Sequence, residues 1–377
     1  MVVPGGYHQR EHHAEQRSED DQHRDAAHIG AKLGWEPVEH RVGAGCGIIP
    51  GRPMHHLSRK LLAAALAALA VAGCGSSGKG LTQATLVLDF VPNAVHAGIY
   101  RAIAAGYYRD AGIDLRVIPP SSTSTTLQLI DAGKAQFGLA DGIDVSEQIA
   151  MGRDEKAIMA IVQRPLGAPI ALASEHLHSA ADLVGKTVGI TGVPSDRAAL
   201  DTVVAHAGGD PAKVKVVTIG FDGVADLEAG KIAAFTGYWP DDGVTLTVSG
   251  YPITVFKLDQ NGGPAYPGLV AFTTRALIAR DPTLVRGFVR ATVRGYEDTL
   301  RDPSRSLGDL LKLNPSIERK LAQASLAAYL PVFDAGGVPD GELVPARIAA
   351  LSTWLVHSHL IAHPIAVSRF GTNAFLP

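Results

Sequence analysis

Acidic, amide and imidazole side chains gather in one short stretch of the chain, between Leu86 and Tyr100. The apolar residues 86–88 predict a strand, and Asp89 and Phe90 follow at its carboxyl end. Asn93 then precedes a helical pattern that carries His96. In open α/β sheets, small ligands bind beyond the carboxyl ends of strands, where helix N-termini offer unpaired N–H groups. This stretch therefore predicts one wall of a small-molecule site.

A turn of sequence Gly192-Val193-Pro194-Ser195 follows another predicted strand, over residues 187–191. Ser195 could cap the next helix, which is predicted to run through His206. The free N–H groups of such a turn could bind an anionic or carbonyl group of a ligand. Because any α/β unit contains a turn of this kind, a purely structural role is the alternative.

Strands and helices alternate through the chain, as βαβ units and a parallel sheet require. Two sets of such units predict the α/β fold class, with two α/β lobes and a central ligand cleft. Lobe 1 is predicted to comprise residues 84–178 and 267–377, and lobe 2 residues 179–266. A strand predicted near residues 170–173 falls in lobe 1 in this division. Amphipathic helices that cover lobe 1 are predicted over residues 282–300, 304–313, 317–329 and 344–357.

Composition excludes several classes of function. The 377-residue chain is 46% apolar and 19% charged, which is ordinary for a globular protein with a sizeable core. With a formal net charge of -3 and no dense Lys/Arg tract with interleaved aromatic residues, nucleic acid is not an expected partner. The only cysteines, Cys46 and Cys74, precede the globular part, so that part has no cysteine for a disulfide or a metal site. We expect no metal and no cofactor.

Residues 1–53 are rich in His and charged side chains and have little periodic apolar patterning. They predict a disordered leader, or a mis-assigned start if translation begins at Met54; metal binding by the histidines is a further alternative. Residues 54–73 predict a secretory signal peptide, because Arg59 and Lys60 precede a short apolar run over residues 61–72. A buried Ala/Leu helix is the alternative for this apolar run.

The sequence Val71-Ala72-Gly73-Cys74 resembles the bacterial lipobox, which implies cleavage before Cys74 and lipidation of its sulfur. A lipidated cysteine and a flexible Gly/Ser-rich linker are then predicted over residues 74–83. The mature protein is therefore expected on the extracytoplasmic face of the cell membrane, held there by acyl chains.

Several segments together resemble the SsuA/THI5-like (NMT1/THI5) family over roughly Leu81 to Tyr329, and most of all its branch that binds pyrimidine precursors of thiamine. The segments are LDFVPNAVHAGIYRAIAAGYYRDAGIDL, LQLIDAGKAQFGLAD, ADLVGKTVGITG, VADLEAGKIAAF and GYW. The D-F/W-x-P-N-x-x-H pattern over residues 89–96 is the distinctive one. The resemblance implies a fold like that of type II periplasmic binding proteins. It also implies a monomeric solute-binding lipoprotein that partners the permease and ATPase subunits of an ABC importer.

An aminopyrimidine is flat and edged with amine donors and ring-nitrogen acceptors, so it needs aromatic faces and carboxylate or amide edges. By resemblance, Asp89, Asn93 and His96 would address the ring edge, and Asp141 would accept from an amine across lobe 1. Tyr238, Trp239 and Asp241 would close over the ring from lobe 2. The predicted ligand-binding residues are Asp89, Phe90, Asn93, His96, Asp141, Gly192, Val193, Ser195, Tyr238, Trp239 and Asp241.

Structural alternatives stay open for four of these residues. Asp89 could only cap the following helix, and Asn93 could only stabilise the turn at Pro92. His96 could be a core histidine with satisfied hydrogen bonds, and Trp239 could pack in a hinge.

Other functions also stay open. The same fold could bind riboflavin, which is compatible with the aromatic residues, or a sulfonate or nitrate, which the acidic residues oppose. The third alternative is a pyrimidine synthase like THI5. By resemblance, such a synthase consumes its own histidine, uses pyridoxal phosphate and has a cysteine-rich motif, which the globular part lacks. We therefore expect a binding protein rather than an enzyme.

Overall fold

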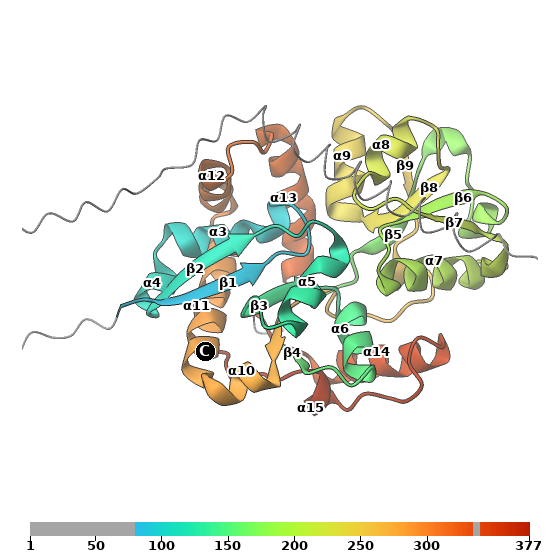
Figure 1. The fold of residues 1–377 in the computed structure, drawn as a ribbon. Helices are drawn as coiled ribbons and strands as arrows, with labels where there is room; N and C mark the ends of the chain where they lie inside the picture. Colours follow the sequence, from blue (N-terminus) through green and yellow to red (C-terminus); the bar gives the residue numbers. More distant parts are fainter. Residues whose placement is uncertain (1–79, 335–339) are drawn as a thin grey trace, which may run out of the picture. The chain divides into compact units, whose positions relative to one another are not determined.

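The computed structural model describes residues 80–334 and 340–377. Residues Ser77–Pro377 form one compact unit (Figure 1). The predicted leader, the signal peptide and the lipidation site at Cys74 lie outside the described residues. No helix within the described ranges combines the length and the apolar character that a membrane span needs.

The first sheet has five strands in the order β2-β1-β3-β10-β4. β1 pairs in parallel with both β2 and β3, and β10 is antiparallel to β3 and β4. Its strands are β1 (Thr82–Val87), β2 (Ile113–Ile118), β3 (Phe137–Ala140), β4 (Glu155–Val162) and β10 (Leu269–Thr274). Because β1 already begins at Thr82, the last residues of the predicted linker belong to the folded sheet.

The second sheet repeats this plan in the order β7-β6-β8-β5-β9. β6 pairs in parallel with β7 and β8, while β5 is antiparallel to β8 and β9. Its strands are β5 (Gly167–Leu172), β6 (Thr187–Ile190), β7 (Lys215–Thr218), β8 (Ala234–Tyr238) and β9 (Ile253–Val255). Two α/β lobes are therefore present, as predicted.

The division between the lobes differs from the predicted one. β5 was expected in lobe 1, but it pairs with β8 and β9 in the sheet of lobe 2. The chain thus crosses between the lobes after Val162 rather than after residue 178. It returns between β9 and β10, and Arg164 Nε donates to Asp259 Oδ2 at 2.8 Å, which joins the two crossing segments.

Helices flank both sheets (Figure 1). Those of lobe 1 are α3 (Ala97–Ala104), α4 (Tyr107–Asp110), α5 (Thr123–Asp131), α6 (Gly142–Ala150), α10 (Arg275–Arg280), α11 (Pro282–Arg301), α12 (Pro303–Leu313), α13 (Arg319–Phe333), α14 (Pro345–His357) and α15 (Val367–Phe370). Those of lobe 2 are α7 (Pro194–His206), α8 (Gly223–Glu228) and α9 (Val244–Val248). The short turns η1 (Ala94–His96) and η5 (Trp239–Gly243) follow β1 and β8.

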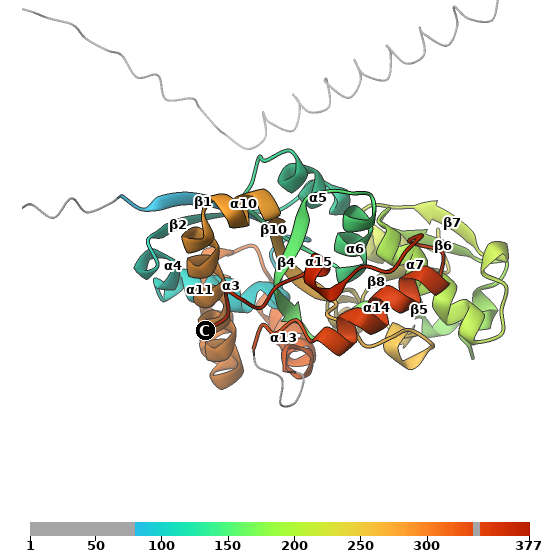
Figure 2. The same cartoon turned by 90° about the horizontal axis from the view of Figure 1, so that it is seen from below.

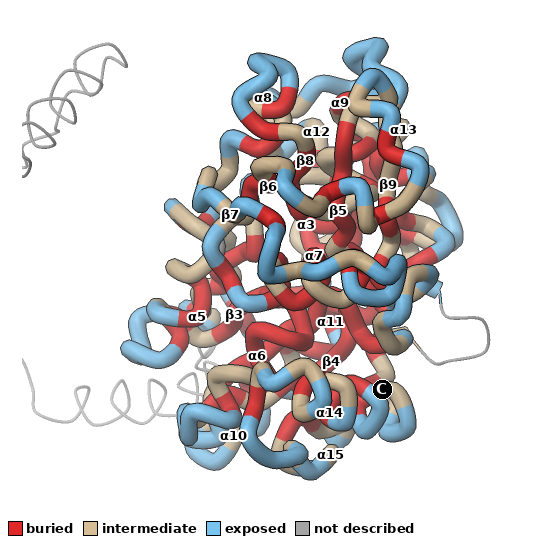
Figure 3. Tube along the Cα trace, turned by 90° about the vertical axis from the view of Figure 1, so that its right-hand side faces the viewer, coloured by how far each residue is buried: buried red, intermediate tan, exposed pale blue. Residues whose placement is uncertain are grey.

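Tight packing holds the first lobe around its site-bearing segment. The buried residues in Figure 3 run through the strands and the helix surfaces that face them. Phe137 of β3 stacks on Phe288 of α11 with 3.9 Å between ring centroids. α11 also lies so close to α3 that a Cβ on Gly295 would collide with the carbonyl oxygen of Gly98. This contact fixes α3, which directly follows η1.

The C-terminal helices of lobe 1 also lie against lobe 2. Residues of α7 and of the end of α14, including Ala198 and Trp354, line one groove, and Figure 2 shows the two helices side by side. On another side, Ser325 Oγ of α13 donates to the carbonyl oxygen of Pro240 in η5 at 2.7 Å. The two lobes therefore also contact each other away from the two crossing segments.

Candidate functional site

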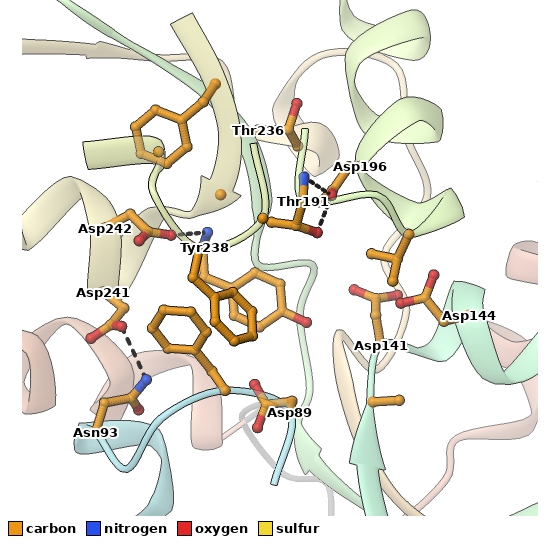
Figure 4. Close-up of a pocket in the computed structure, with 18 of the residues that line it drawn as sticks. Asp89, Asn93, Asp141, Asp144, Thr191, Asp196, Thr236, Tyr238, Asp241 and Asp242 are labelled. Atoms are coloured by element: carbon orange, nitrogen blue, oxygen red, sulfur yellow. Dashed lines mark hydrogen bonds between the residues drawn. The ribbon is translucent and has the colours of Figure 1, made fainter. Parts of the chain in front are cut away.

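A cavity lies where the carboxyl ends of strands from both sheets face each other (Figure 4). Its volume is about 70 Å³ when measured as the space open to the centre of a water molecule. Its lining residues come from both lobes: Asp89, Phe90, Asn93, Leu139, Ala140, Asp141, Asp144, Thr191, Val193, Asp196, Gly220, Phe221, Gly223, Phe235, Thr236, Gly237, Tyr238, Asp241 and Asp242. The space suits a small organic molecule rather than a single water.

Asp89 enters the cavity from the end of β1, with His96 directly behind it. Asp89 Oδ1 lies 2.9 Å from His96 Nε2, and His96 Nδ1 accepts the backbone N–H of Asn93 at 3.1 Å. Because Nδ1 acts as an acceptor, the ring hydrogen that faces Asp89 lies on Nε2. His96 is fully buried and is not among the lining residues. Its role in the structure is to orient the carboxylate of Asp89.

Asn93 connects the two lobes across the cavity. Its Oδ1 accepts the backbone N–H of Val95 at 2.9 Å, as an N-cap of η1. Its Nδ2 donates to Asp241 Oδ2 of lobe 2 at 3.0 Å. Burial raises the pKa of Asp241 to about 6, and the charge of Asp89 adds to the rise, while hydrogen bonds from Ser325 and Asn93 oppose it. Asn93 is therefore both a local cap and a contact between lobes.

A second contact between lobes involves Asp144 in the first turn of α6. Its two oxygens accept from the backbone N–H and the hydroxyl of Ser195, each at 3.0 Å. Burial raises the pKa of Asp144 to about 8, although the bonds from Ser195 act in the opposite direction. Nearby, Asp141 caps α6 by accepting from Ile143 N at 2.8 Å, and burial raises its pKa well above the usual range.

The turn before α7 is occupied by a carboxylate of the protein itself. Asp196 accepts from the backbone N–H and the hydroxyl of Thr191 (Figure 4), and hydrogen bonding from the backbone N–H groups of Gly192 and Val193 lowers its pKa against the rise that burial causes. Gly192 adopts a φ of 107°, which only glycine tolerates well, so the turn can wrap around this carboxylate. The N–H groups that the sequence suggested for a ligand anion are thus already paired.

Aromatic rings form one wall of the cavity. Phe90 of lobe 1 meets Phe221 of lobe 2 edge to face, with 4.5 Å between centroids and 82° between planes. Tyr238 also lines the cavity, and burial raises the pKa of its phenol well above 10, so it stays neutral. Trp239 does not line it; its ring is covered by Lys257, whose Nζ lies 3.3 Å from the ring centroid.

Seven of the eleven predicted ligand-binding residues line the cavity: Asp89, Phe90, Asn93, Asp141, Val193, Tyr238 and Asp241. His96, Gly192, Ser195 and Trp239 lie outside its lining. Sequence reasoning missed Asp144, Thr191, Asp196, Phe221, Phe235, Thr236 and Asp242. Asp144 stands one turn after Asp141, and Asp196 and Asp242 each adjoin a predicted residue, so helical spacing and adjacency were the available signals.

The lining is rich in hydrogen-bond acceptors. It contains six carboxyl groups, and none of the described residues that line it is Lys, Arg or His. The hydroxyl of Thr236 is fully buried and has no hydrogen-bond partner among the described residues. The described ranges hold no group of three or more His, Cys, Asp or Glu residues arranged to bind a metal. The site is therefore built to accept hydrogen bonds from a guest and to contact it with aromatic rings.

A model of the family described as NMT1/THI5 like matches residues 93–306, which is more than half of the chain. The chain belongs to the NMT1/THI5-like family. The resemblance that the sequence motifs suggested is thereby confirmed.

Proteins with different described functions are similar to the chain. The formylaminopyrimidine-binding protein of Halalkalibacterium halodurans is 29% identical over 84% of this chain and 98% of its own length. The riboflavin-binding protein RibY of Chloroflexus aurantiacus is 30% identical over 79% of this chain and 87% of its own length. A 4-amino-5-hydroxymethyl-2-methylpyrimidine phosphate synthase of Legionella pneumophila is 26% identical over 78% of this chain and 93% of its own length.

Solved structures share the fold. The alkanesulfonate-binding protein SsuA from Xanthomonas axonopodis pv. citri, bound to MOPS, superposes with a TM-score of 0.63 at 16% identity. The match covers 77% of this chain and 98% of that protein. The predicted fold class, two α/β lobes like those of periplasmic binding proteins, is thus confirmed.

Proposed function

We propose that this protein is the solute-binding lipoprotein of an ABC importer and that it captures a pyrimidine-type thiamine precursor, formylaminopyrimidine or hydroxymethylpyrimidine. The observation that carries this proposal is the cavity between the lobes, with an aromatic wall and an edge of carboxyl groups. An aminopyrimidine presents a flat face to such rings and amine donors to such acceptors. The similarity to a formylaminopyrimidine-binding protein supports the same class of ligand.

The arrangement of donors argues against an anionic solute. A sulfonate or nitrate would need free N–H groups at a helix N-terminus or a positive side chain. Here the N-terminus of α7 is filled by Asp196 and Asp144, and the described lining has no cation. An anion in this cavity would face carboxyl groups without compensation.

Riboflavin is the second candidate, because one relative of similar identity binds it. Aromatic contacts with Phe90, Phe221 and Tyr238 are compatible with a flavin ring. The carboxyl groups of the lining match the amine donors of an aminopyrimidine, whereas a flavin ring offers mainly carbonyl and ring-nitrogen acceptors. We therefore favour the pyrimidine.

The cavity suits binding without chemical change. A synthase that uses pyridoxal phosphate would need a lysine for the aldehyde and a cation for the phosphate. Neither is among the described lining residues. His96, in the distinctive family segment, is buried and hydrogen-bonded through both ring nitrogens, so it is not placed to be consumed as a substrate.

In this proposal the lobes close on the ligand and open when the protein meets the importer. The contacts of Asn93 with Asp241 and of Asp144 with Ser195 would then stabilise the closed form. Acyl chains on Cys74 would hold the protein, as a monomer, on the extracytoplasmic face of the membrane.

Thermal unfolding of the full-length protein with separate ligands tests the proposal. The panel is formylaminopyrimidine, hydroxymethylpyrimidine, thiamine, riboflavin, taurine and nitrate. A ligand at 100 times its dissociation constant should add about 2.7 kcal/mol of stability.

The change Asp89→Ala should weaken binding roughly 10- to 100-fold, because a hydrogen bond to a charged group contributes about 1.5–3 kcal/mol. Asp114→Ala, on the exposed face of β2, is the matched control. Stabilisation by taurine or nitrate, with no response to either pyrimidine, would refute the proposal.

A further inference from the structure

The described residues that line the cavity include acidic side chains but no basic ones. Carboxyl groups enter it from every side: Asp89 after β1, Asp141 and Asp144 at α6, Asp196 at α7, and Asp241 and Asp242 in η5. The donors that pair with them are mostly backbone N–H groups, hydroxyls and one amide, all of them neutral. A ligand that enters this space meets a surplus of acceptors and no compensating cation among the described lining residues.

Asp89 is the carboxylate best placed to meet a ligand. Its Oδ1 accepts from His96, and no described residue donates to its Oδ2. Figure 4 shows the Asp89 carboxylate beside the cavity, between Asn93 and Asp141. The imidazole of His96, whose Nδ1 accepts the backbone N–H of Asn93, donates through Nε2 and holds the carboxylate in orientation.

A neutral aminopyrimidine fits these acceptors poorly on part of its edge. Its amino group can donate, but each unprotonated ring nitrogen has a lone pair that would face carboxylate lone pairs. Protonation of one ring nitrogen converts an acceptor into a donor and adds a positive charge. Both changes match the cavity, because charge-assisted hydrogen bonds are the stronger ones in a water-poor site.

We propose that the cavity binds its pyrimidine as a cation, with the protonated ring nitrogen donating to the free oxygen of Asp89. This inference rests on the proposed function, since it concerns the charge state of the same ligand. It adds that affinity for a pyrimidine rises with the basicity of its ring nitrogens. A neutral ring of the same shape without a basic nitrogen is a poor ligand.

The nitrogen chemical shift of a labelled ligand tests the charge state directly. The probe is 4-amino-5-hydroxymethyl-2-methylpyrimidine with ¹⁵N in the ring, bound to the full-length protein about one pH unit above the pKa of the free ligand. Free ligand is then mostly neutral. We expect the bound ring nitrogen to show the shift of a protonated nitrogen. A rise of at least about one unit in the pKa of the bound ligand corresponds to a tenfold preference for the cation.

Two variants assign the effect to Asp89. Asp89→Asn keeps the size of the side chain and removes the charge, so its bound ligand should be neutral or its affinity at least tenfold weaker. Asp114→Asn, on the exposed face of β2 and outside the cavity, is the matched control and should bind the cation as the parent does.

Each outcome separates this inference from the proposed function. A neutral bound ligand in the parent protein would overturn the inference and leave pyrimidine binding intact. A protonated ligand at full affinity in Asp89→Asn would overturn the role of Asp89. No saturable binding of this probe or of formylaminopyrimidine to the parent would overturn the proposed function itself.

Discussion

Replacing Asp144 with Asn should stabilise the ligand-free protein, and increasingly so at higher pH. Burial raises the pKa of Asp144 from 3.8 to about 8 in the folded protein, whereas the unfolded chain ionises near 3.8. Stability from such a group is fully present below the unfolded pKa and is lost as the pH rises through the folded pKa. Between about pH 4 and pH 8 the parent should therefore lose stability that the Asn variant keeps.

The size of the effect follows from the two pKa values. Acting alone, the difference would cost the parent about 4 kcal/mol at pH 7, at 1.36 kcal/mol per pH unit. Asp141 and Asp196 share the same field, so removing one charge relieves part of their cost and changes the pH range over which it appears. We expect a net gain of roughly 2 kcal/mol at pH 7, which is about 3 °C in melting temperature for a folded unit of this size. Asn can still accept the backbone N–H of Ser195, so the contact between the lobes is kept.

Thermal unfolding of the parent and of Asp144→Asn at pH 4, 6 and 8, without ligand, measures this difference. Asp114→Asn, on the exposed face of β2, serves as the control and should follow the parent at every pH. The reasoning fails if Asp144→Asn melts parallel to the parent across the whole range. It also fails if the variant is less stable than the parent at pH 8, because the carboxylate would then be stabilising as an ion.

Three further changes probe the cavity. Asn93→Ala removes the bond to Asp241 and should weaken pyrimidine binding about 3- to 10-fold in calorimetry, with X-ray scattering showing a more open protein. Tyr238→Ala should weaken binding about 3- to 10-fold more than Trp239→Ala, because only Tyr238 lines the cavity. Asp196→Ala frees the N–H groups of the turn before α7; it should cost about 1–3 kcal/mol of stability, part of which sulfate should restore in a thermal-shift assay.

The local sequence pattern was enough to locate the part of the site that follows β1 and begins η1. The apolar run before Asp89 ends where β1 ends, and Asn93 caps η1, because strand ends and caps are specified by neighbouring residues. The same holds for α11 and α12, each capped by an Asp and begun by a Pro. Features set within a few residues can thus be predicted from the sequence.

Pairing over long sequence separations could not be predicted in this way. β5 is a short apolar strand that either sheet could accept, and only its contacts with β8 and β9 place it in lobe 2. Asp144 and Ser195 meet across 51 residues of chain, so neither sequence neighbourhood indicates the other. Trp239 follows Tyr238 but belongs to η5, and its ring packs against Lys257, so the cavity receives only one of the two rings.

The start of α7 explains how a site in this fold can be unsuited to an anionic ligand and suited to one that donates hydrogen bonds. A helix N-terminus carries a partial positive charge and free N–H groups, which is why it attracts anionic ligands. In this chain Asp196 accepts from the backbone N–H and the hydroxyl of Thr191, and Asp144 accepts from the backbone N–H of Ser195, so acidic side chains of the protein occupy that position. The field that reaches the ligand is then set by the remaining acids, with Asp89 foremost. A protein that shares the fold of an alkanesulfonate-binding protein can therefore have the start of this helix filled by two of its own acidic side chains.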